Sequence, residues 1–207
     1  MTPRAGLRDA LAGHRWFAHQ GEAVQRALAA TARAVDMPRG TQIFARGEPG
    51  ERLMLVRDGV VKISNVSLEG REVVLSFVKG GELLGEIAAL DGGPRTADAT
   101  AMTHVSAVAW PRRTFMDVMR AHPDFALDVI SSLCERLRQT NDMVEAAAQL
   151  SMAARLARAL AGLLKNAGRE TPEGWRLAFK LSQRDLGAHV GLARENVNRQ
   201  LKQWEQA

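Results

Sequence analysis

The sequence predicts an α+β protein in which an antiparallel β-roll is followed by a long helix and then by a pair of short helices. Ten of the 18 glycines lie between Gly40 and Gly93, a density that helices tolerate poorly. The same stretch alternates short β-rich runs with turn signals, which is typical of rolls and barrels of antiparallel strands. After Pro111 the apolar residues recur with a helical period instead.

Length and composition describe a globular chain without a membrane segment. The 207 residues are 46% hydrophobic and 25% charged, values that allow a sizeable core. Charges interrupt every apolar run before the roughly 18 residues of a membrane helix, and the N-terminal segment with Arg4, Arg8 and Asp9 lacks an apolar secretory core. A single cysteine, Cys134, excludes an internal disulfide, a cysteine-rich zinc site and an iron–sulfur cluster. We therefore expect a cytoplasmic protein with no metal and no membrane partner.

The roll is expected to begin after one short helix. That helix lies around Glu22–Ala34. The expected strands are Gln42–Ala45, Leu53–Arg57, Val60–Val66, Glu72–Val78, Ala97–Ala101 and Val105–Trp110. Leu68-Glu69-Gly70-Arg71 is expected to turn a hairpin between two of these strands.

A long helix with an apolar stripe follows a short helix over Thr114–Arg120. Seven residues recur at alternating spacings of four and three, namely Ala126, Ile130, Leu133, Leu137, Thr140, Val144 and Ala147. This pattern predicts a coiled-coil seam of about three heptads. A lone helix would bury such a stripe poorly, so we expect a homodimer interface. Packing against the roll of the same chain is the alternative, and both can hold on different faces of the helix. Cys134, beside the seam, is expected to be a small buried apolar residue rather than a sensor.

The C-terminal part is expected to be helical apart from one turn and strand. Ser151 can cap a helix over Met152–Asn166, and Thr171–Lys180 is expected to form a turn and a short strand. Two short helices follow, Ser182–Val190 and Ala193–Glu205. Their apolar residues can form one small core of Leu186, Val190, Leu192, Val197, Leu201 and Trp204. We therefore expect three parts with limits at 1–121, 122–148 and 149–207.

The positive charge of the chain is concentrated in the last of these parts. The net charge is +5, and residues 148–207 hold 10 Lys and Arg residues against 5 Asp and Glu residues. The whole excess therefore lies in the last 60 residues. This asymmetry indicates a polyanionic partner for one part of the molecule, with a solvated basic surface as the alternative.

Residues 85–97 carry the densest chemical signal. A glycine-flanked turn exposes consecutive backbone N–H groups, which suit a phosphate, and the guanidinium of Arg95 adds a charged fork that matches phosphate oxygens. Glu86 is a poor phosphate ligand but can accept hydrogen bonds from a sugar hydroxyl. Together they predict a ligand with both a phosphate and a ribose, against the alternative of a surface ion pair.

The two short helices at the C-terminus form a candidate helix-turn-helix. Gly191 gives the turn its backbone freedom, and Ser182 with Asp185 resembles a capping box. The second helix directs four polar residues away from the core, namely Arg194, Glu195, Asn198 and Arg199. Arginine can pair with guanine and glutamate with cytosine in the major groove. Two amphipathic helices with a solvated charged face are the alternative.

These two motifs resemble those of the Crp–Fnr regulators. The residues Gly85, Glu86, Ile87, Ala88, Pro94, Arg95 and Ala97 are similar, in register, to the phosphate-binding cassette of cyclic-nucleotide-binding domains. The resemblance implies that Arg95 and Thr96 hold the cyclic phosphate with backbone N–H groups near Ile87 and Ala88. It also implies that Glu86 binds the ribose 2′-hydroxyl and that Ile63 and Leu75 line the pocket.

The long helix adds residues for the base. Arg136, Thr140 and Asn141 fall where cyclic-AMP-responsive members have an arginine, a threonine and a serine that faces the adenine. Asn141 departs from that pattern. Thr140 also interrupts the apolar seam, and a hydroxyl there needs a partner, either the adenine amino group or a residue across the dimer. The resemblance therefore implies cyclic AMP, with cyclic GMP or no ligand in reserve.

The residues 191–199 resemble the turn and recognition helix of the same family. The resemblance implies that Arg194, Glu195 and Arg199 read bases, while Gln183 and the backbone near Ser182 contact phosphates. The family usually has a serine or threonine where this chain has Ala193, so an N-cap worth about 1 kcal/mol is expected to be missing. We also expect the β-hairpin wing of a winged helix to be missing, because the sequence ends at residue 207.

The sequence thus predicts a homodimeric transcription regulator, with no catalytic residues, that binds cyclic AMP and then a pseudopalindromic DNA site. RNA polymerase is an expected further partner. The alternatives are a cyclic-nucleotide-binding module that acts on a protein partner and a family regulator that needs no nucleotide. An enzyme is not expected, because no nucleophile–base pair or metal-ligand spacing is present.

Overall fold

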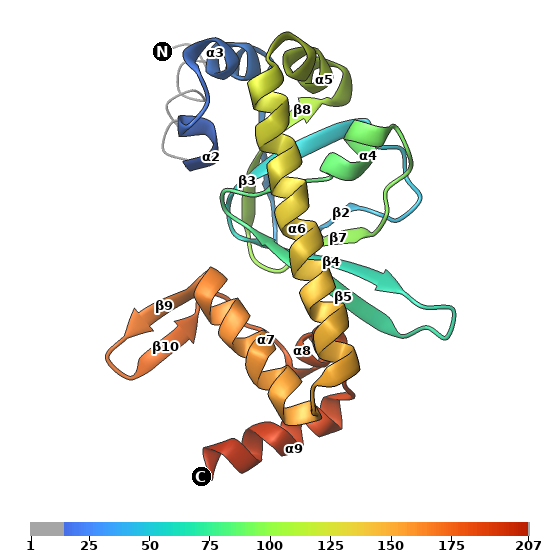
Figure 1. The fold of residues 1–207 in the computed structure, drawn as a ribbon, viewed down its shortest axis with the longest axis vertical. Coiled ribbons are helices and arrows are strands. Elements are labelled where there is room, and N and C mark those ends of the chain that lie inside the picture. Colours follow the sequence, from blue (N-terminus) through green and yellow to red (C-terminus); the bar gives the residue numbers. More distant parts are fainter. Residues whose placement is uncertain (1–14, 207) are drawn as a thin grey trace. The chain divides into compact units, whose positions relative to one another are not determined.

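The computed structural model describes residues 15–206 (Figure 1). The N-terminal residues on which we based the absence of a secretory segment lie outside this range. The described chain divides into two compact units. The first comprises the chain up to Ile63 together with Phe77–Cys134, and the second comprises Ser64–Ser76 together with the chain from Glu135 onward. The three-part division expected from the sequence stays a prediction.

Two four-stranded sheets form the roll, which confirms the predicted α+β class. The first has the order β1 (Arg33–Met37), β8 (Val105–Pro111), β3 (Arg52–Asp58) and β6 (Leu83–Leu84). The second has the order β2 (Gln42–Phe44), β7 (Asp98–Ala101), β4 (Val60–Val66) and β5 (Glu72–Lys79). β3 pairs antiparallel with both β8 and β6.

The predicted hairpin turn joins β4 and β5. The Ser67 N–H donates to the Arg71 carbonyl over 2.8 Å, and Gly70 has a φ of +75°. A side chain is strained in that left-handed conformation, which explains the glycine at this corner.

Alternate residues of the first sheet pack on its two faces, as the period of two requires. On one face, Leu53 and Leu55 of β3 join a cluster with the helices. On the other face, Met54 and Val56 join residues of the second sheet. The roll therefore has one core between its sheets and another beneath its helices.

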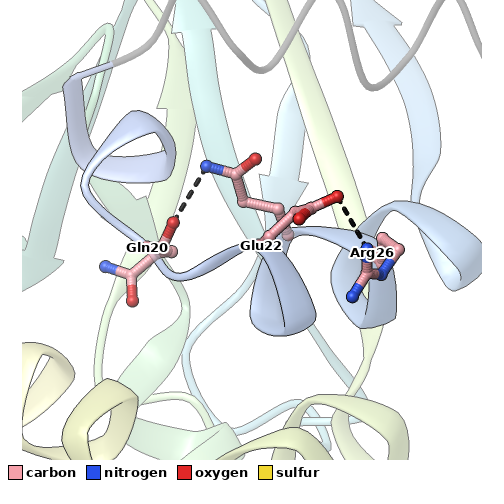
Figure 2. Close-up of polar contacts among 4 residues, drawn as sticks. Gln20, Glu22 and Arg26 are labelled. Atoms are coloured by element: carbon pink, nitrogen blue, oxygen red, sulfur yellow. Dashed lines mark hydrogen bonds and ion pairs between the residues drawn. The ribbon is translucent and has the colours of Figure 1, made fainter.

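Helices α2 (Arg15–Ala18), α3 (Glu22–Thr31) and α5 (Arg112–Ala121) contribute to the second of these cores. The indole N–H of Trp110 donates to the Leu28 carbonyl over 2.8 Å and so fixes the end of α3. At its start, Gln25 donates to the Gln20 carbonyl over 2.9 Å and Arg26 pairs with Glu22 over 2.6 Å (Figure 2).

The long helix α6 (Pro123–Gln149) buries one side and exposes another. Phe125 and Val129 belong to the core beneath the helices. The predicted seam residues Ile130, Leu137 and Val144 are exposed, Leu137 to 61%. None of the three belongs to either buried cluster of the roll, and the homodimer interface expected for this stripe stays a prediction. Cys134 is also exposed, and the expectation of a buried cysteine is wrong for the single chain.

The second unit contains a helix, a small hairpin and two crossed helices. α7 (Met152–Ala167) begins at Ser151, whose hydroxyl accepts from the Ala154 N–H over 3.3 Å. β9 (Gly168–Thr171) and β10 (Gly174–Leu177) pair antiparallel, where the sequence predicted one turn and one strand. α8 (Gln183–Val190) and α9 (Arg194–Glu205) then follow at the predicted positions.

Two further elements and one residue differ from the prediction. The first helix ends at Thr31 and β1 follows it, because pairing with β8 outweighs the helical preference of the alanine-rich segment. The two-residue strand β6 is too short for a sequence signal. Trp204 is 39% exposed, so it lies at the edge of the helix-turn-helix core rather than within it.

Candidate functional site

The segment 85–97 folds as a short helix followed by a loop. Gly85 has a φ of +78° and caps the six-residue helix α4 (Glu86–Asp91). Gly92 ends it, with a φ of +75°. The sequence predicted a turn with exposed N–H groups. The structure forms a helical turn there instead, with Ala88 and Ala89 buried in it.

Arg95 is the central charged group of this segment, and its side chain is only 4% exposed. Its Nη1 donates to the Gly85 carbonyl over 2.7 Å, and its Nη2 donates to the Arg52 carbonyl over 2.6 Å. Its Nε is buried and has no hydrogen-bond partner among the described residues. A buried arginine with an N–H left over is prepared for an acceptor that is not part of the chain.

Glu86 lies in the same segment and is 3% exposed. Because both Glu86 and Arg95 are buried, the alternative of a surface ion pair is wrong. Burial lowers the pKa of the Arg95 guanidinium, and the charge of Arg52 lowers it further. Glu48 and Glu86 raise that pKa, so the two carboxylates partly compensate a buried cation.

The other predicted ligand residues differ in exposure. Ile63 is half-buried and packs against the core between the sheets, whereas Leu75 is 41% exposed. Ile87 and Thr96 are exposed. Ala88 is buried.

The three residues predicted to meet the base lie on the α6 portion of the second unit. Arg136 is half-buried, and Thr140 and Asn141 are exposed. The Thr140 hydroxyl donates to the Arg136 carbonyl over 3.0 Å. Its hydrogen therefore has a partner within the helix, and its oxygen still has lone pairs available to accept.

The helix-turn-helix has the predicted caps and turn. The Ser182 hydroxyl accepts from the Asp185 N–H over 3.0 Å and contacts the Asp185 carboxylate at 2.5 Å. Gly191 ends α8 with a φ of +69°, and Ala193 begins α9 without a side-chain cap. Val197 is fully buried beneath the turn.

The predicted base-reading residues share the free side of α9. Arg194, Glu195 and Arg199 are exposed, and Asn198 is half-exposed. A shallow hollow of about 390 Å³ is lined by Glu195, Asn198, Arg199, Lys202, Gln203 and Gln206. Every residue that lines this hollow is polar, so the side of α9 that faces away from the helix-turn-helix core is polar there. At the start of α8, the cap residue Ser182 is exposed and Gln183 is half-buried.

Three residues with a part in these sites were missed from the sequence. Phe44 covers the guanidinium of Arg95 at 4.3 Å from the ring centroid, and Arg52 supplies a carbonyl to it. Neither residue carries a sequence signal, because the contacts depend on strands that are distant in the chain. Gly187 lies within α8 and packs against the turn that follows the helix. A Cβ there would stand 2.5 Å from the Leu192 carbonyl oxygen. An isolated glycine within a helix was the available signal.

Residues 15–206 contain neither a membrane-spanning helix nor a candidate metal site. No helix in that range is long and apolar enough to cross a membrane. Nor do its histidine, cysteine, aspartate and glutamate side chains gather in any group of three that could hold a metal ion.

Known proteins match both parts of the chain. Residues 34–122 match the family model of the cyclic nucleotide-binding domain, and residues 154–207 match that of the Crp-like helix-turn-helix domain. A CRP-like cAMP-activated global transcriptional regulator of Mycobacterium tuberculosis is 34% identical over 84% of this chain and 78% of its own length. A global nitrogen regulator of Synechocystis is 30% identical over 79% of this chain and 73% of its own length.

A solved structure has the same fold over most of the chain. It is a transcriptional regulator of the CRP/FNR family from Thermus thermophilus, with a TM-score of 0.71 and 26% sequence identity. The match covers 84% of this chain and 86% of that one. All three proteins are named as regulators and none as an enzyme. With a cyclic nucleotide-binding domain, a Crp-like helix-turn-helix and relatives of this similarity, the chain belongs to the CRP/FNR family of DNA-binding transcription regulators.

Proposed function

We propose that this protein is a homodimeric regulator that binds cyclic AMP and, in that state, a pseudopalindromic DNA site. The observation that carries the proposal is the buried Arg95, whose Nε–H has no partner in the described part of the chain, in the same short segment as the buried Glu86. Keeping a guanidinium away from water is costly unless an anion compensates it. A cyclic phosphate supplies that anion, and a ribose hydroxyl supplies a donor to the glutamate.

The proposed pocket is assigned by resemblance to the phosphate-binding cassette. Arg95 and Thr96 hold the phosphate, with backbone N–H groups near Ile87 and Ala88, and Glu86 binds the ribose 2′-hydroxyl. Gly85 leaves the space that the arginine needs, since a Cβ at this position would collide with Arg95 Nη1. Ile63 and Leu75 complete the lining.

Cyclic AMP is the proposed nucleotide because of the long helix and the relatives. Arg136, Thr140 and Asn141 are assigned to the adenine side. The free lone pairs of the Thr140 oxygen suit the adenine amino group, which donates hydrogen bonds. The regulator of Mycobacterium tuberculosis with 34% identity is named as cAMP-activated, which supports the same choice.

The exposed stripe on α6 supports the dimer. Ile130, Leu137 and Val144 together present apolar surface at coiled-coil spacing, and exposed apolar stripes of this kind mark association sites. A second copy of the same helix buries the stripe about a two-fold axis. The dimer then carries two copies of α9.

Helix α9 is the proposed recognition helix. Arg194, Glu195 and Arg199 read bases, with Asn198 beside them, while Ser182 and Gln183 contact phosphates. Two such helices related by a two-fold axis enter successive major grooves about 34 Å apart. The excess positive charge of the last 60 residues favours the same polyanion. The proposal includes RNA polymerase as a further partner and a cytoplasmic location, where bacterial DNA is found.

The first experiment is a calorimetric titration with cyclic AMP, cyclic GMP and 5′-AMP. We expect micromolar binding of cyclic AMP and a loss of about 100-fold in R95A, because charge-assisted hydrogen bonds are worth about 1.5–3 kcal/mol each. The matched control is R120A, which removes an exposed arginine of the first unit paired with Asp117 and should bind as the wild type does. Equal binding by R95A and R120A would contradict the pocket.

The second experiment is DNA protection with and without cyclic AMP. We expect protection of a pseudopalindromic site that depends on the nucleotide and is lost in R194A and R199A but kept in R120A. Protection without any nucleotide would identify a family regulator that needs no ligand. Nucleotide binding without protection of any duplex would identify a module that acts on a protein partner.

A further inference from the structure

We propose that Phe44 is a positioning residue for nucleotide binding: it holds the Arg95 guanidinium in the plane and direction in which it meets the phosphate. This inference rests on the proposed function. It adds a residue that contacts no nucleotide and acts only through Arg95.

Backbone pairing brings Phe44 and Arg95 together. Phe44 is the last residue of β2 and lies opposite Ala99 of β7. In the loops that follow, the Gly47 N–H donates to the Arg95 carbonyl over 2.9 Å, and the Arg95 N–H donates to the Glu48 carbonyl over 2.8 Å. The two segments are therefore held side by side on both sides of the contact.

The Phe44 ring covers one face of the guanidinium. Arg95 Cζ lies 4.3 Å from the ring centroid, within the range of a cation–π interaction. The ring is itself half-buried and packs against the core between the sheets. A ring fixed in this way can set the plane of the guanidinium, because guanidinium groups stack on aromatic faces.

Two carbonyls then fix the direction of the guanidinium within that plane. Nη1 donates to Gly85 and Nη2 to Arg52. Gly85 closes the arrangement, because an ideal Cβ there would collide with Nη1 and lie 3.3 Å from Phe44 Cε1. The glycine is thus required by the arginine and the ring together.

One guanidinium nitrogen has no hydrogen-bond partner among residues 15–206. Nε of Arg95 is buried without a partner, whereas the two terminal nitrogens each have a carbonyl. Without the ring, the guanidinium would keep its charge and its two carbonyl partners but could tilt out of the plane that the ring sets. The affinity for the phosphate would then fall, because part of the binding free energy would be spent on ordering the arginine.

The test is a double-mutant cycle on the affinity for cyclic AMP. We expect F44L to weaken binding about ten-fold, a loss between those of an exposed and of a desolvated cation–π contact, and F44Y to bind nearly as the wild type does. In R95K the planar cation is absent, so F44L should add less than about a three-fold loss to that background. The matched control is F125L, which removes a ring that packs on Phe115 in the other core and should leave the affinity unchanged.

The outcomes separate this inference from the proposed function. If the wild type binds cyclic AMP and F44L binds equally well, or loses the same factor in the R95K background, the positioning role is refuted. If the wild type binds no nucleotide, the proposed function fails. The effect of Phe44 on the Arg95 side chain can still be measured in the ligand-free protein, by hydrogen exchange. The Arg95 Nε–H signal, assigned by its absence from the NMR spectrum of R95K, should then exchange with water at least about ten-fold faster in F44L than in F125L. Equal exchange rates would refute the positioning role.

Discussion

Gly187 and Gly162 are expected to respond in opposite ways to the same substitution. Both glycines lie in helices of the second unit, Gly187 in α8 and Gly162 in α7. A Cβ at Gly162 would meet nothing within 4 Å. A Cβ at Gly187 would stand 2.5 Å from the Leu192 carbonyl oxygen and 3.5 Å from Val197 Cγ2. The obstacle is a backbone atom of the turn, which cannot rotate away.

The magnitudes follow from these distances. An alanine is favoured over a glycine by about 1 kcal/mol in a helix interior, so G162A should raise the free energy of unfolding by up to that amount. The same gain applies to G187A, but forcing a methyl group into a packed site costs about 1–3 kcal/mol. The Gly187 carbonyl also accepts from the Leu192 N–H over 2.8 Å, so any shift of the turn weakens this bond. We expect G187A to be less stable than G162A by about 1–3 kcal/mol.

Urea denaturation followed by helical circular dichroism measures both variants against the wild type. DNA protection measures the second consequence, since opening the crossing of α8 and α9 displaces the recognition helix. G187A should lose affinity for the operator and G162A should keep it. If G187A is as stable as G162A, the close approach does not constrain the turn and the reasoning is wrong.

Three further expectations concern the dimer, the pH dependence and the caps. L137E should dissociate the dimer, since it places a charge in the apolar stripe, and sedimentation would show a monomer where R138E, an exposed substitution on the same helix, stays dimeric. Burial lowers the pKa of the His189 imidazole, and the Val74 carbonyl partly restores it. As the pH falls, this imidazole therefore takes up a proton in the unfolded chain, at about pH 6.5, before it does so in the folded protein. The free energy of unfolding should be constant above that pH and fall below it. H189Q should flatten this slope in denaturation series at different pH, and an unchanged slope would exclude His189 as its source. A193S supplies the missing cap of α9 at an extended backbone and should raise the free energy of unfolding by about 1 kcal/mol; a lower stability would show that the hydroxyl does not reach an N–H group.

The elements that the sequence predicted well are those with a local signal. The strand limits at Val60–Val66 agree residue for residue with β4, because Gly59 directly precedes the strand and the turn signal at 68–71 follows it. The caps of α7 and α8 at Ser151 and Ser182 are likewise local, since each hydroxyl accepts from an N–H three residues later. The exposed seam of α6 also followed from spacing alone.

The site could be predicted only in its outline. Glu86 and Arg95 were found because they are close in the sequence and chemically unusual. Their burial and the contacts of Arg95 with Phe44 and Arg52 depend on strands that are distant in the sequence, and no local pattern encodes such pairing. The same reason explains why the predicted helix included Arg33 and Ala34, the first two residues of β1, since the partner strand β8 lies far along the chain.

The hairpin between β4 and β5 has a consequence for how the protein can be divided. Its outer part, Ser64–Ser76, belongs to the unit with the helix-turn-helix, while the ends of both strands belong to the unit with Arg95. The His189 ring contacts the Val74 carbonyl at 3.2 Å, which attaches the hairpin to α8. The chain therefore crosses between the units three times, and cutting α6 alone would leave two covalent connections in place. A fragment that starts within α6 would lack a part of its own packing, so the DNA-binding unit is not a separable tail but is assembled from two distant stretches of the chain.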